Sequence, residues 1–367
     1  MTAPHCTTQA SDATPTCRSA KPKTLALAAI AALCMATAVV AFSQTRPRNA
    51  GDLRLMFYNL ENYFSPFADS LNPQKEFSES SQRYWTWNRF VKKTNDIFRV
   101  IVAVGGATPP DLIGVCEVEN RFVLNRIIYE TPLAKYPYGL VHHDSPDSRG
   151  IDVGLLYNKE TFELLGSKFF PVTLPTGRTT RELLLAKGVV NELDTLHVVV
   201  CHLPSKYGGA AASEGSRMAA ALALRHIADS ILASSRNANL IIMGDFNDTP
   251  DSPCIAEGLG ASLNLSGTAR DSLYNLALPL HRAEIGSIKF QGRWELIDLF
   301  FVSGNLLNPA SPIYCLPTDY YIFSAPFLLE SDAQHTGDKP HRTYNGYRYN
   351  GGVSDHLPAV LELRKGF

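Results

Sequence analysis

The chain has 367 residues, of which 45% are hydrophobic and 19% are charged. This composition is ordinary for a soluble globular protein. The net charge of −1 excludes an overall basic field that would attract nucleic acid or an anionic membrane, although it leaves room for a local basic patch.

The first 50 residues differ from the rest of the chain. Residues 24–42 are uncharged and almost wholly apolar, and three basic residues precede them. A basic flank followed by an apolar run and small residues is typical of an export signal, here with cleavage before Gln44. The run also approaches the ~20 residues that span a bilayer, so an uncleaved anchor is the alternative. We therefore expect residues 1–50 to be a signal peptide or N-terminal membrane anchor with a flanking linker. In both cases the main domain is extracytoplasmic: periplasmic, secreted or anchored.

From residue 53 onward, short runs of β-branched and aliphatic residues alternate with helical patterns. Apolar runs of four to eight residues are typical of strands buried on both faces. In chain order, the predicted strands cover residues 53–59, 111–120, 151–158, 196–202, 239–248, 296–303 and 357–363. The predicted helices cover residues 82–104, 121–130 and 211–233. Strands alternating with helices predict an α/β layered fold. No linker divides the chain, so we expect one domain over residues 51–367.

Residues 303–350 form a long, weakly periodic tract rich in Tyr, Pro, Gly and Asn. A tract of this length is usually functional, or an excursion packed on the surface. Its last part, HTGDKPHRTYNGYRYNGG, interleaves basic and aromatic residues, which suits phosphate contacts combined with base stacking. A tyrosine-rich loop that covers the edge of the domain is the alternative.

The chain contains seven cysteines, and four of them lie beyond the N-terminal segment: Cys116, Cys201, Cys254 and Cys315. Their wide spacing and the lack of a C-x-x-C pair argue against a disulfide framework and against a thiolate zinc site. Cys116 and Cys201 lie inside predicted strands, so we expect them to be small buried hydrophobic residues.

Most of the predicted strands end on, or contain, a polar residue that a buried strand would not normally carry. Acids and amides are seldom buried without a partner. The ends of adjacent strands converge in space, and active sites are commonly built there. The polar residues concerned are Asn59, Glu117, His202, Asp245, Asn247, Asp298, Asp355 and His356. We therefore expect these side chains to form one site.

The residue types in this set indicate a particular chemistry. Carboxylate and amide oxygens without thiolates are hard ligands that suit Mg²⁺, with Mn²⁺ as the alternative. Two histidines add acid–base capacity or transition-state hydrogen bonds near neutral pH. Together these groups predict metal-dependent hydrolysis of a phosphoester.

The motifs FYNLEN, VCEVEN, VCHLPS, GDFND, LIDLFFV and SDHLP, in this order, resemble the endonuclease/exonuclease/phosphatase superfamily. Its members include DNase I-like nucleases, apurinic endonucleases, inositol polyphosphate phosphatases and bacterial sphingomyelinases. The resemblance covers nearly all of residues 53–363, and SPDSRGIDVGLLYN is similar to the bacterial secreted nuclease-like branch. It implies a two-sheet β-sandwich flanked by helices, the DNase I-like four-layer sandwich, with a catalytic domain over residues 51–367.

The same resemblance implies a role for each polar residue. Glu117 would be the principal metal ligand, supported by Asn59 and Asp355. Asp245 and Asn247 would orient the attacking water and bind the phosphate. His202 and His356 would flank the scissile phosphate, and Asp298 would hydrogen-bond His356 and fix its tautomer. Whether His356 or Asp245 accepts the proton is left open at this point.

Four further residues are candidates for supporting roles. Asp152 is expected to orient His202, with a solvated strand start as the alternative. Lys206 follows the His202 strand and is expected to lie in a loop that contacts substrate. Arg178 and Arg181 are candidates for binding phosphate through their guanidinium groups, with surface ion pairs as the alternative.

The sequence thus predicts a Mg²⁺-dependent hydrolase of phosphodiester bonds, in the first place an extracytoplasmic nuclease acting on DNA or RNA. A phosphomonoesterase or a phospholipid-headgroup phosphodiesterase on the same fold is the alternative, followed by a non-catalytic protein that binds a phosphorylated ligand. The expected partner is a phosphoester substrate, in the first place nucleic acid. Membrane contact is expected only through an uncleaved N-terminal segment, and the protein is expected to be a monomer.

Overall fold

The computed structural model of the chain describes residues 1–2, 46–67, 76–206, 208–265 and 268–366. The chain divides into two compact units, Met1–Ser43 and Gln44–Phe367, and the second unit holds the fold described below. The predicted export signal or anchor at residues 24–42 lies outside the described residues. Within the described part of the chain, no helix combines the length and the apolar character needed to cross a membrane.

The first of two large sheets is built around β1, a strand in which nearly every residue is buried. β1 runs parallel to β2 and antiparallel to β19; β2 pairs antiparallel with β4, and β4 pairs antiparallel with β3. The strands follow the order β13-β19-β1-β2-β4-β3, with β14 also paired to β19. Their bounds are β1 (Leu53–Tyr63), β2 (Leu112–Val118), β3 (Tyr138–His142), β4 (Asp152–Asn158), β13 (Ile313–Tyr314), β14 (Tyr320–Ile322) and β19 (Ala359–Lys365).

The second large sheet has the order β5-β6-β7-β8-β12-β9; among the strand pairs of the described residues, β7 and β8 run parallel and the others antiparallel. Its central strand β8 is buried along its whole length, as expected of a near-continuous apolar run. The bounds are β5 (Phe162–Phe170), β6 (Leu183–Val190), β7 (Asp194–His202), β8 (Asn239–Asp245), β9 (Leu273–Asn275) and β12 (Asp298–Ser303).

The two sheets pack against each other through apolar side chains of their inner faces. Gly114 of β2 lies opposite Met243 of β8, and a Cβ added at Gly114 would lie only 2.7 Å from the Met243 Cε atom. Because no side chain fits there, glycine permits the close approach of the two sheets. The core between them brings the strand ends of both sheets to a common edge.

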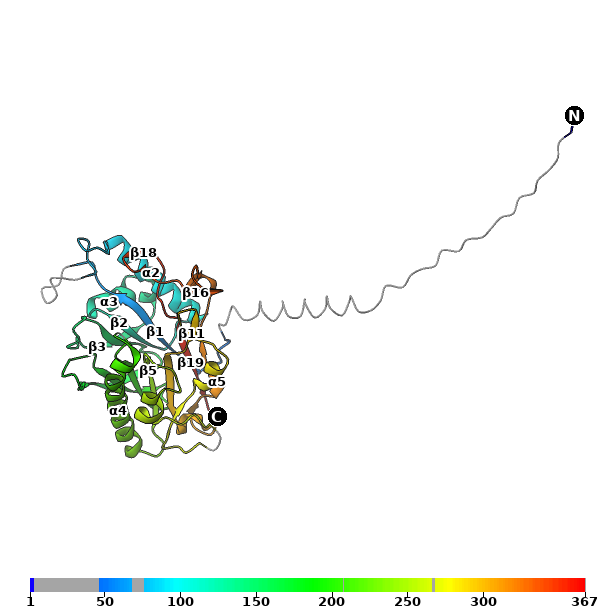
Figure 1. The fold of residues 1–367 in the computed structure, drawn as a ribbon. Helices are drawn as coiled ribbons and strands as arrows, with labels where there is room; N and C mark the ends of the chain where they lie inside the picture. Colours follow the sequence, from blue (N-terminus) through cyan, green and yellow to red (C-terminus); the bar gives the residue numbers. More distant parts are fainter. Residues whose placement is uncertain (3–45, 68–75, 207, 266–267, 367) are drawn as a thin grey trace. The chain divides into compact units, whose positions relative to one another are not determined.

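Helices cover the outer faces of the two sheets (Figure 1). α2 (Trp87–Gly105) and α3 (Arg121–Tyr129) pack on the first sheet, and α4 (Ala210–Ser234) packs on the second. The Thr86 side chain caps α2 by accepting from the Arg89 backbone N–H, so this helix begins several residues later than predicted. The succession of helix, sheet, sheet and helix confirms the predicted two-sheet sandwich flanked by helices.

The tract predicted as a long loop, residues 303–350, is instead built from short elements. Its β17–β18 hairpin packs on the start of α2, where the Arg89 guanidinium lies 4.2 Å from the centre of the Tyr349 ring. The hairpin therefore covers an edge of the domain. The remaining short elements of the chain are η1 (Pro132–Lys135), η2 (Cys254–Leu259), α5 (Leu278–Arg282), β10 (Ile288–Phe290), β11 (Arg293–Glu295), η3 (Gly304–Leu307), η4 (Pro317–Asp319), η5 (Pro326–Leu328), β15 (Leu329–Ser331), β16 (Asp338–Pro340), β17 (Tyr344–Asn345) and β18 (Arg348–Tyr349).

The four cysteines of the second unit are free and buried. Burial raises the pKa of the Cys116 and Cys201 thiols well above the ordinary value, and the nearby Asp245 carboxylate raises both further. The prediction that Cys116 and Cys201 act as small buried hydrophobic residues is therefore confirmed.

Candidate active site

Asp245, at the end of β8, lies at the centre of a cluster of polar side chains. Its Oδ2 atom is 3.7 Å from His202 Nε2 and 3.8 Å from His356 Nε2. The same oxygen accepts a hydrogen bond of 3.0 Å from Asn59 Nδ2. The other oxygen, Oδ1, accepts from the Asn247 backbone N–H at 2.8 Å. One carboxylate thus joins the ends of β7 and β8 to β1, which continues to Tyr63, so that Asn59 lies within this strand rather than at its predicted end.

His356 is held in place by contacts from both sheets. Its Nδ1 lies 2.7 Å from Asp298 Oδ2, which is the contact predicted from the sequence. The Ser354 hydroxyl donates to the Asn59 carbonyl and accepts from the His356 backbone N–H. The backbone of His356 also forms a β-bridge with Ile288 of β10. Because Asp298 accepts at Nδ1, the Nε2 atom faces Asp245.

The two histidines have opposite protonation preferences. Burial alone would lower the pKa of His356, but the carboxylates of Asp298 and Asp245 raise it well above its ordinary value. Burial and the neighbouring Arg181 lower the pKa of His202 well below that value. Burial also raises the pKa of Asp245 to about 7, against the opposing charge of His356. The site therefore combines an imidazolium, a neutral imidazole and a carboxyl group that titrates near neutrality.

Glu117 occupies a strained position in β2. The pairing of β2 with β4 shifts register between Cys116 and Val118, so Glu117 is the extra residue of a bulge. Its φ of +57° places a non-glycine residue in the left-handed region, which costs on the order of 1–3 kcal/mol. Glu117 Oε2 accepts from the Asn62 backbone N–H at 2.8 Å, and Oε1 lies 3.5 Å from Arg149 Nη2. Because of the bulge, the Glu117 carboxylate contacts Asn62 and Arg149 outside the β2–β4 pairing.

Glu61 belongs to the site, although we did not predict it from the sequence. Its carboxylate accepts from the Thr343 backbone N–H at 2.6 Å and from Arg342 Nε at 3.2 Å. Arg342 also donates to Asp355 Oδ2 at 2.9 Å, and buried Lys93 donates to the Glu61 carbonyl. Burial and repulsion by Asp355 raise the pKa of Glu61 to about 7. This network links Arg342, Thr343 and Asp355, near the C-terminus, to β1. In the sequence, Glu61 could have been recognised as an acid two residues after Asn59 in a buried strand.

Arg149 and Arg181 reach the site from loops. Arg149, which the sequence did not suggest, lies 3.1 Å from Asn62 Oδ1. Arg181 is nearly buried, donates to the Leu203 carbonyl, and pairs with Asp147 rather than with the neighbouring surface glutamates. The positive charges of both groups lower the pKa of His202, and Arg181 also contacts Leu203, the residue that follows this histidine. They are therefore suited to bind an anion beside this histidine.

Two other predicted substrate-binding residues are more peripheral. Lys206 Nζ lies 3.5 Å from Asp248 Oδ1 and 3.6 Å from Glu295 Oε2, beside the β10–β11 hairpin. Arg178 is exposed, and among the described residues its side chain has no hydrogen bond or ion pair with the site. Asn247, expected to bind phosphate, donates from its side chain to the Leu203 carbonyl and has a φ of +51°. Its amide thus joins the ends of β7 and β8.

The expected contact between Asp152 and His202 is absent. Asp152 Oδ1 accepts from the Ser145 backbone N–H at 2.8 Å, and Oδ2 lies 3.3 Å from His142 Nε2. His202 Nδ1 is buried without a hydrogen-bond partner among the described residues. Asp152 contacts His142 instead, because β3, a strand that was not predicted, pairs with β4 and ends at His142.

The donor set fits a hard divalent cation. The ligand atoms of Asp245, Asp298 and His356 lie within 4.8 Å of one another, but the protonated form of His356 cannot bind a metal, so the neighbouring carboxylates are the ligands to consider. The carboxylates of Glu61, Glu117 and Asp355 all raise the pKa of Arg342, so they share one region. Oxygen atoms dominate, and the nearby thiols of Cys116 and Cys201 are held protonated by burial. Crowded carboxylates of this kind are neutralised by Mg²⁺ or Mn²⁺ more readily than by a soft metal.

Two sheets that meet at a buried Asp–His pair, with a second histidine and a cluster of carboxylates, define a phosphoester hydrolase with a DNase I-like sandwich. Residues 54–365 match the Endonuclease/Exonuclease/phosphatase family, and the chain belongs to this family. The resemblance found in the sequence motifs is thereby confirmed.

Solved structures share this fold. A humanized D. rerio TDP2 superposes with a TM-score of 0.53 at 15% identity, covering 86% of this chain and 100% of that one. The human Nocturnin catalytic domain with bound sulfate gives 0.52 at 16% identity, covering 87% and 96%. An endonuclease/exonuclease/phosphatase from Bacteroides vulgatus gives 0.50 at 18% identity, covering 86% and 99%. At these identities the likeness shows the fold alone. None of the curated proteins compared matches this chain significantly in sequence.

Proposed function

We propose that this protein is a Mg²⁺- or Mn²⁺-dependent phosphodiesterase that cleaves DNA or RNA outside the cytoplasm and acts as a monomer. The observation that carries the chemistry is the position of Asp245 Oδ2, 3.7 Å from His202 Nε2 and 3.8 Å from His356 Nε2. The two histidines prefer opposite protonation states on either side of one carboxyl group. Such a set of groups with divergent pKa values supports acid–base chemistry at neutral pH. The extracytoplasmic location is inferred from residues 1–50.

Each group of site residues has its own role in the proposed hydrolysis. Glu117, Asn59 and Asp355 would hold the divalent cation, which would neutralise part of the phosphate charge. Asp245, with a pKa of about 7, accepts the proton of the attacking water. The His356 imidazolium, fixed by Asp298, donates from Nε2 to the phosphate oxygens. We thus assign the proton acceptor to Asp245, because His356 is already protonated.

A groove next to the site supports a polymeric substrate. Its cavity of about 540 Å³ opens at Asp355 and Arg342 and is also lined by Phe290 and Lys339. Phe290 is 56% exposed at the end of β10, the strand bridged to His356. An exposed ring beside basic side chains offers a stacking surface for a base adjacent to the scissile phosphate. A phosphomonoester would leave this groove unused.

The test is incubation of the full-length protein with supercoiled plasmid and with single-stranded RNA, in Mg²⁺, in Mn²⁺ and with EDTA. Glu117→Ala and His356→Ala are compared with changes of two exposed residues, Glu160→Ala and His226→Ala. We expect cleavage that requires the metal, disappears in the first two variants and persists in the controls.

Two results would overturn the proposal. Cleavage that survives in Glu117→Ala and His356→Ala would place the activity elsewhere or in a contaminant. A folded protein that cleaves neither nucleic acid but hydrolyses a phosphomonoester or a phospholipid headgroup would keep the site chemistry and replace the substrate.

A further inference from the structure

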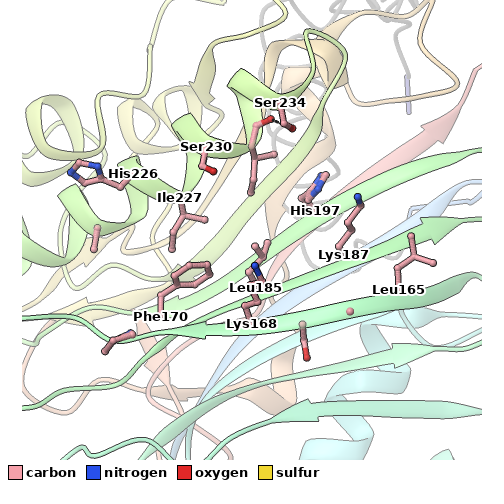
Figure 2. Close-up of a pocket in the computed structure, with 15 residues that line it drawn as sticks. Leu165, Lys168, Phe170, Leu185, Lys187, His197, His226, Ile227, Ser230 and Ser234 are labelled. Carbon is pink, nitrogen blue, oxygen red and sulfur yellow. Dashed lines mark hydrogen bonds between the residues drawn. The ribbon is translucent and has the colours of Figure 1, made fainter.

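A second cavity, of about 740 Å³, lies between α4 and the strands β5, β6 and β7 (Figure 2). Side chains of successive strand residues point to opposite faces of a sheet. His197 of β7 lines this cavity, whereas His202, five residues later on the same strand, points to the other face and into the active site. None of the active-site residues lines the cavity.

The cavity exists because α4 covers only part of the second sheet. The helix packs against β8 and η2, so the outer face of β5 and β6 lacks a full helical cover. The helix presents Ala223, Ile227 and Ile231 to the gap at a spacing of four residues, which keeps them on one face. The pairing of β5 with β6 is irregular between Leu164 and Gly166, and a Cβ at Gly166 would meet no atom within 4 Å. Small residues and an irregular strand thus leave an open groove.

The groove combines an apolar floor with basic side chains. The floor is formed by Leu185, Ile227, Ile231 and Phe170, and the basic groups are Lys168, Lys187, His197 and His226. No Asp or Glu lines the groove, and among the described residues neither lysine has an ion-pair partner. Lys187 and His197 are register partners on neighbouring strands, as Figure 2 shows. Burial lowers the pKa of His197, and the charge of Lys187 lowers it further.

We propose that this groove binds a single-chain amphipathic carboxylate, that is, a fatty acid. The apolar floor would receive the alkyl chain, and Lys168 and Lys187 would hold the carboxylate. Unpaired lysines beside buried aliphatic side chains complement an anion with an apolar tail, whereas a neutral amphiphile would leave both charges uncompensated. The volume lies within the usual range of small-molecule sites.

A protein partner is disfavoured by size. A standard protein interface uses roughly 20–30 residues on each side, whereas 15 residues line this groove. Nucleic acid is disfavoured because its phosphates would face an apolar floor rather than a basic surface. The fatty acid is the occupant that satisfies both the floor and the lysines.

The experiment is isothermal titration of the full-length protein, purified without detergent, with three probes of equal chain length: laurate, dodecanol and dodecyltrimethylammonium, each below its solubility or micelle limit. We expect laurate to bind at one molecule per chain and at least tenfold more tightly than the other two. The double change Lys168→Glu with Lys187→Glu is expected to lower laurate affinity at least tenfold and to reverse the preference in favour of dodecyltrimethylammonium. The matched control is Lys135→Glu with Lys159→Glu, two exposed lysines elsewhere.

Ala223→Trp, which fills the groove from the helix side, is expected to remove binding of all three probes. Circular dichroism and phosphoesterase activity report whether each variant is folded, independently of the groove. Equal affinity for the three head groups, no binding of any probe to the wild type, or laurate affinity that is unchanged in the lysine variant would each overturn the proposal.

Discussion

His356 Nδ1 lies 2.7 Å from Asp298 Oδ2, and the two residues adjoin different sheets: Asp298 begins β12 of the second sheet, whereas His356 lies three residues before β19 of the first. The reactive imidazole is therefore oriented by the opposite layer of the sandwich. Replacing Asp298 by Asn keeps the shape but removes the charge that holds the imidazolium. We expect kcat to fall on the order of 10²–10⁴-fold with little change in KM. Steady-state kinetics check this, and thermal unfolding checks the fold. A loss below tenfold would show that Asp298 is not needed to orient His356.

Arg149 contacts both Asn62 and Glu117 from the β3–β4 connection and is 45% exposed. Substrate phosphate can therefore compete for its guanidinium. We expect Arg149→Ala to raise KM roughly tenfold, the loss of one charged hydrogen bond, and Arg149→Lys to recover only part of this because lysine lacks the planar fork. The measurement is kinetics on a short oligonucleotide, with Arg236→Ala as a control on the surface. An unchanged KM alongside a lower kcat would instead assign Arg149 to the chemical step.

Glu117 is held at a φ of +57°, where alanine is strained and glycine is not. Both Glu117→Ala and Glu117→Gly remove the carboxylate and should abolish activity. The glycine variant should nevertheless be the more stable of the two, by up to about 1 kcal/mol, reversing the usual order. Urea unfolding of both variants makes the comparison. If the alanine variant were clearly more stable, the left-handed backbone at this position would be ruled out.

His202 should make stability fall in mild acid. Burial lowers its pKa in the folded protein well below the unfolded value near 6.5. Above pH 6.5 the ring is neutral in both states. Below it, the unfolded chain takes up a proton that the folded protein does not, so the free energy of unfolding decreases as pH falls, by at most about 1.4 kcal/mol per pH unit.

His202→Gln removes this titration. The difference between wild-type and variant free energies of unfolding should therefore decline from pH 6.5 downward and be flat above it. His356 has the opposite sign, because its raised pKa stabilises the fold at low pH and this contribution is lost as pH rises through the folded value. It is present in both proteins, so the difference reports the titration of His202 together with its coupling to His356. A flat difference across pH 4.5–6.5 would contradict a buried neutral His202.

Most of the site could be predicted because its residues are polar groups at the ends of apolar strands. Asn59, Asp245 and Asp298 stand out in this way, and the Asp298–His356 contact follows from the family motifs. Glu61 lies in the same buried strand and was passed over, because its partners Arg342 and Thr343 come from a tract without periodicity.

Residues supplied by loops could not be predicted from strand patterns. Arg149 reaches Glu117 only because the β3–β4 connection folds back over the site, and Asp147 meets Arg181 for the same reason. The pairing of Asp152 was missed because β3 is short: only the four residues YGLV precede His142 in this strand. Strand patterns thus identified the site residues that lie on or beside the strands. The site residues supplied by loops depend on tertiary contacts that the strand patterns do not contain.

The four buried thiols of the second unit can report local unfolding of the structure around them. A cysteine is alkylated as its thiolate and only when solvent reaches it. Burial raises the pKa of Cys116 and Cys201 well above the ordinary value and that of Cys254 to about 11. Reagent therefore reacts only when the surrounding structure opens. Since Cys116 lies on β2 and Cys201 on β7, the labelling rate at each would time the separate opening of the two sheets.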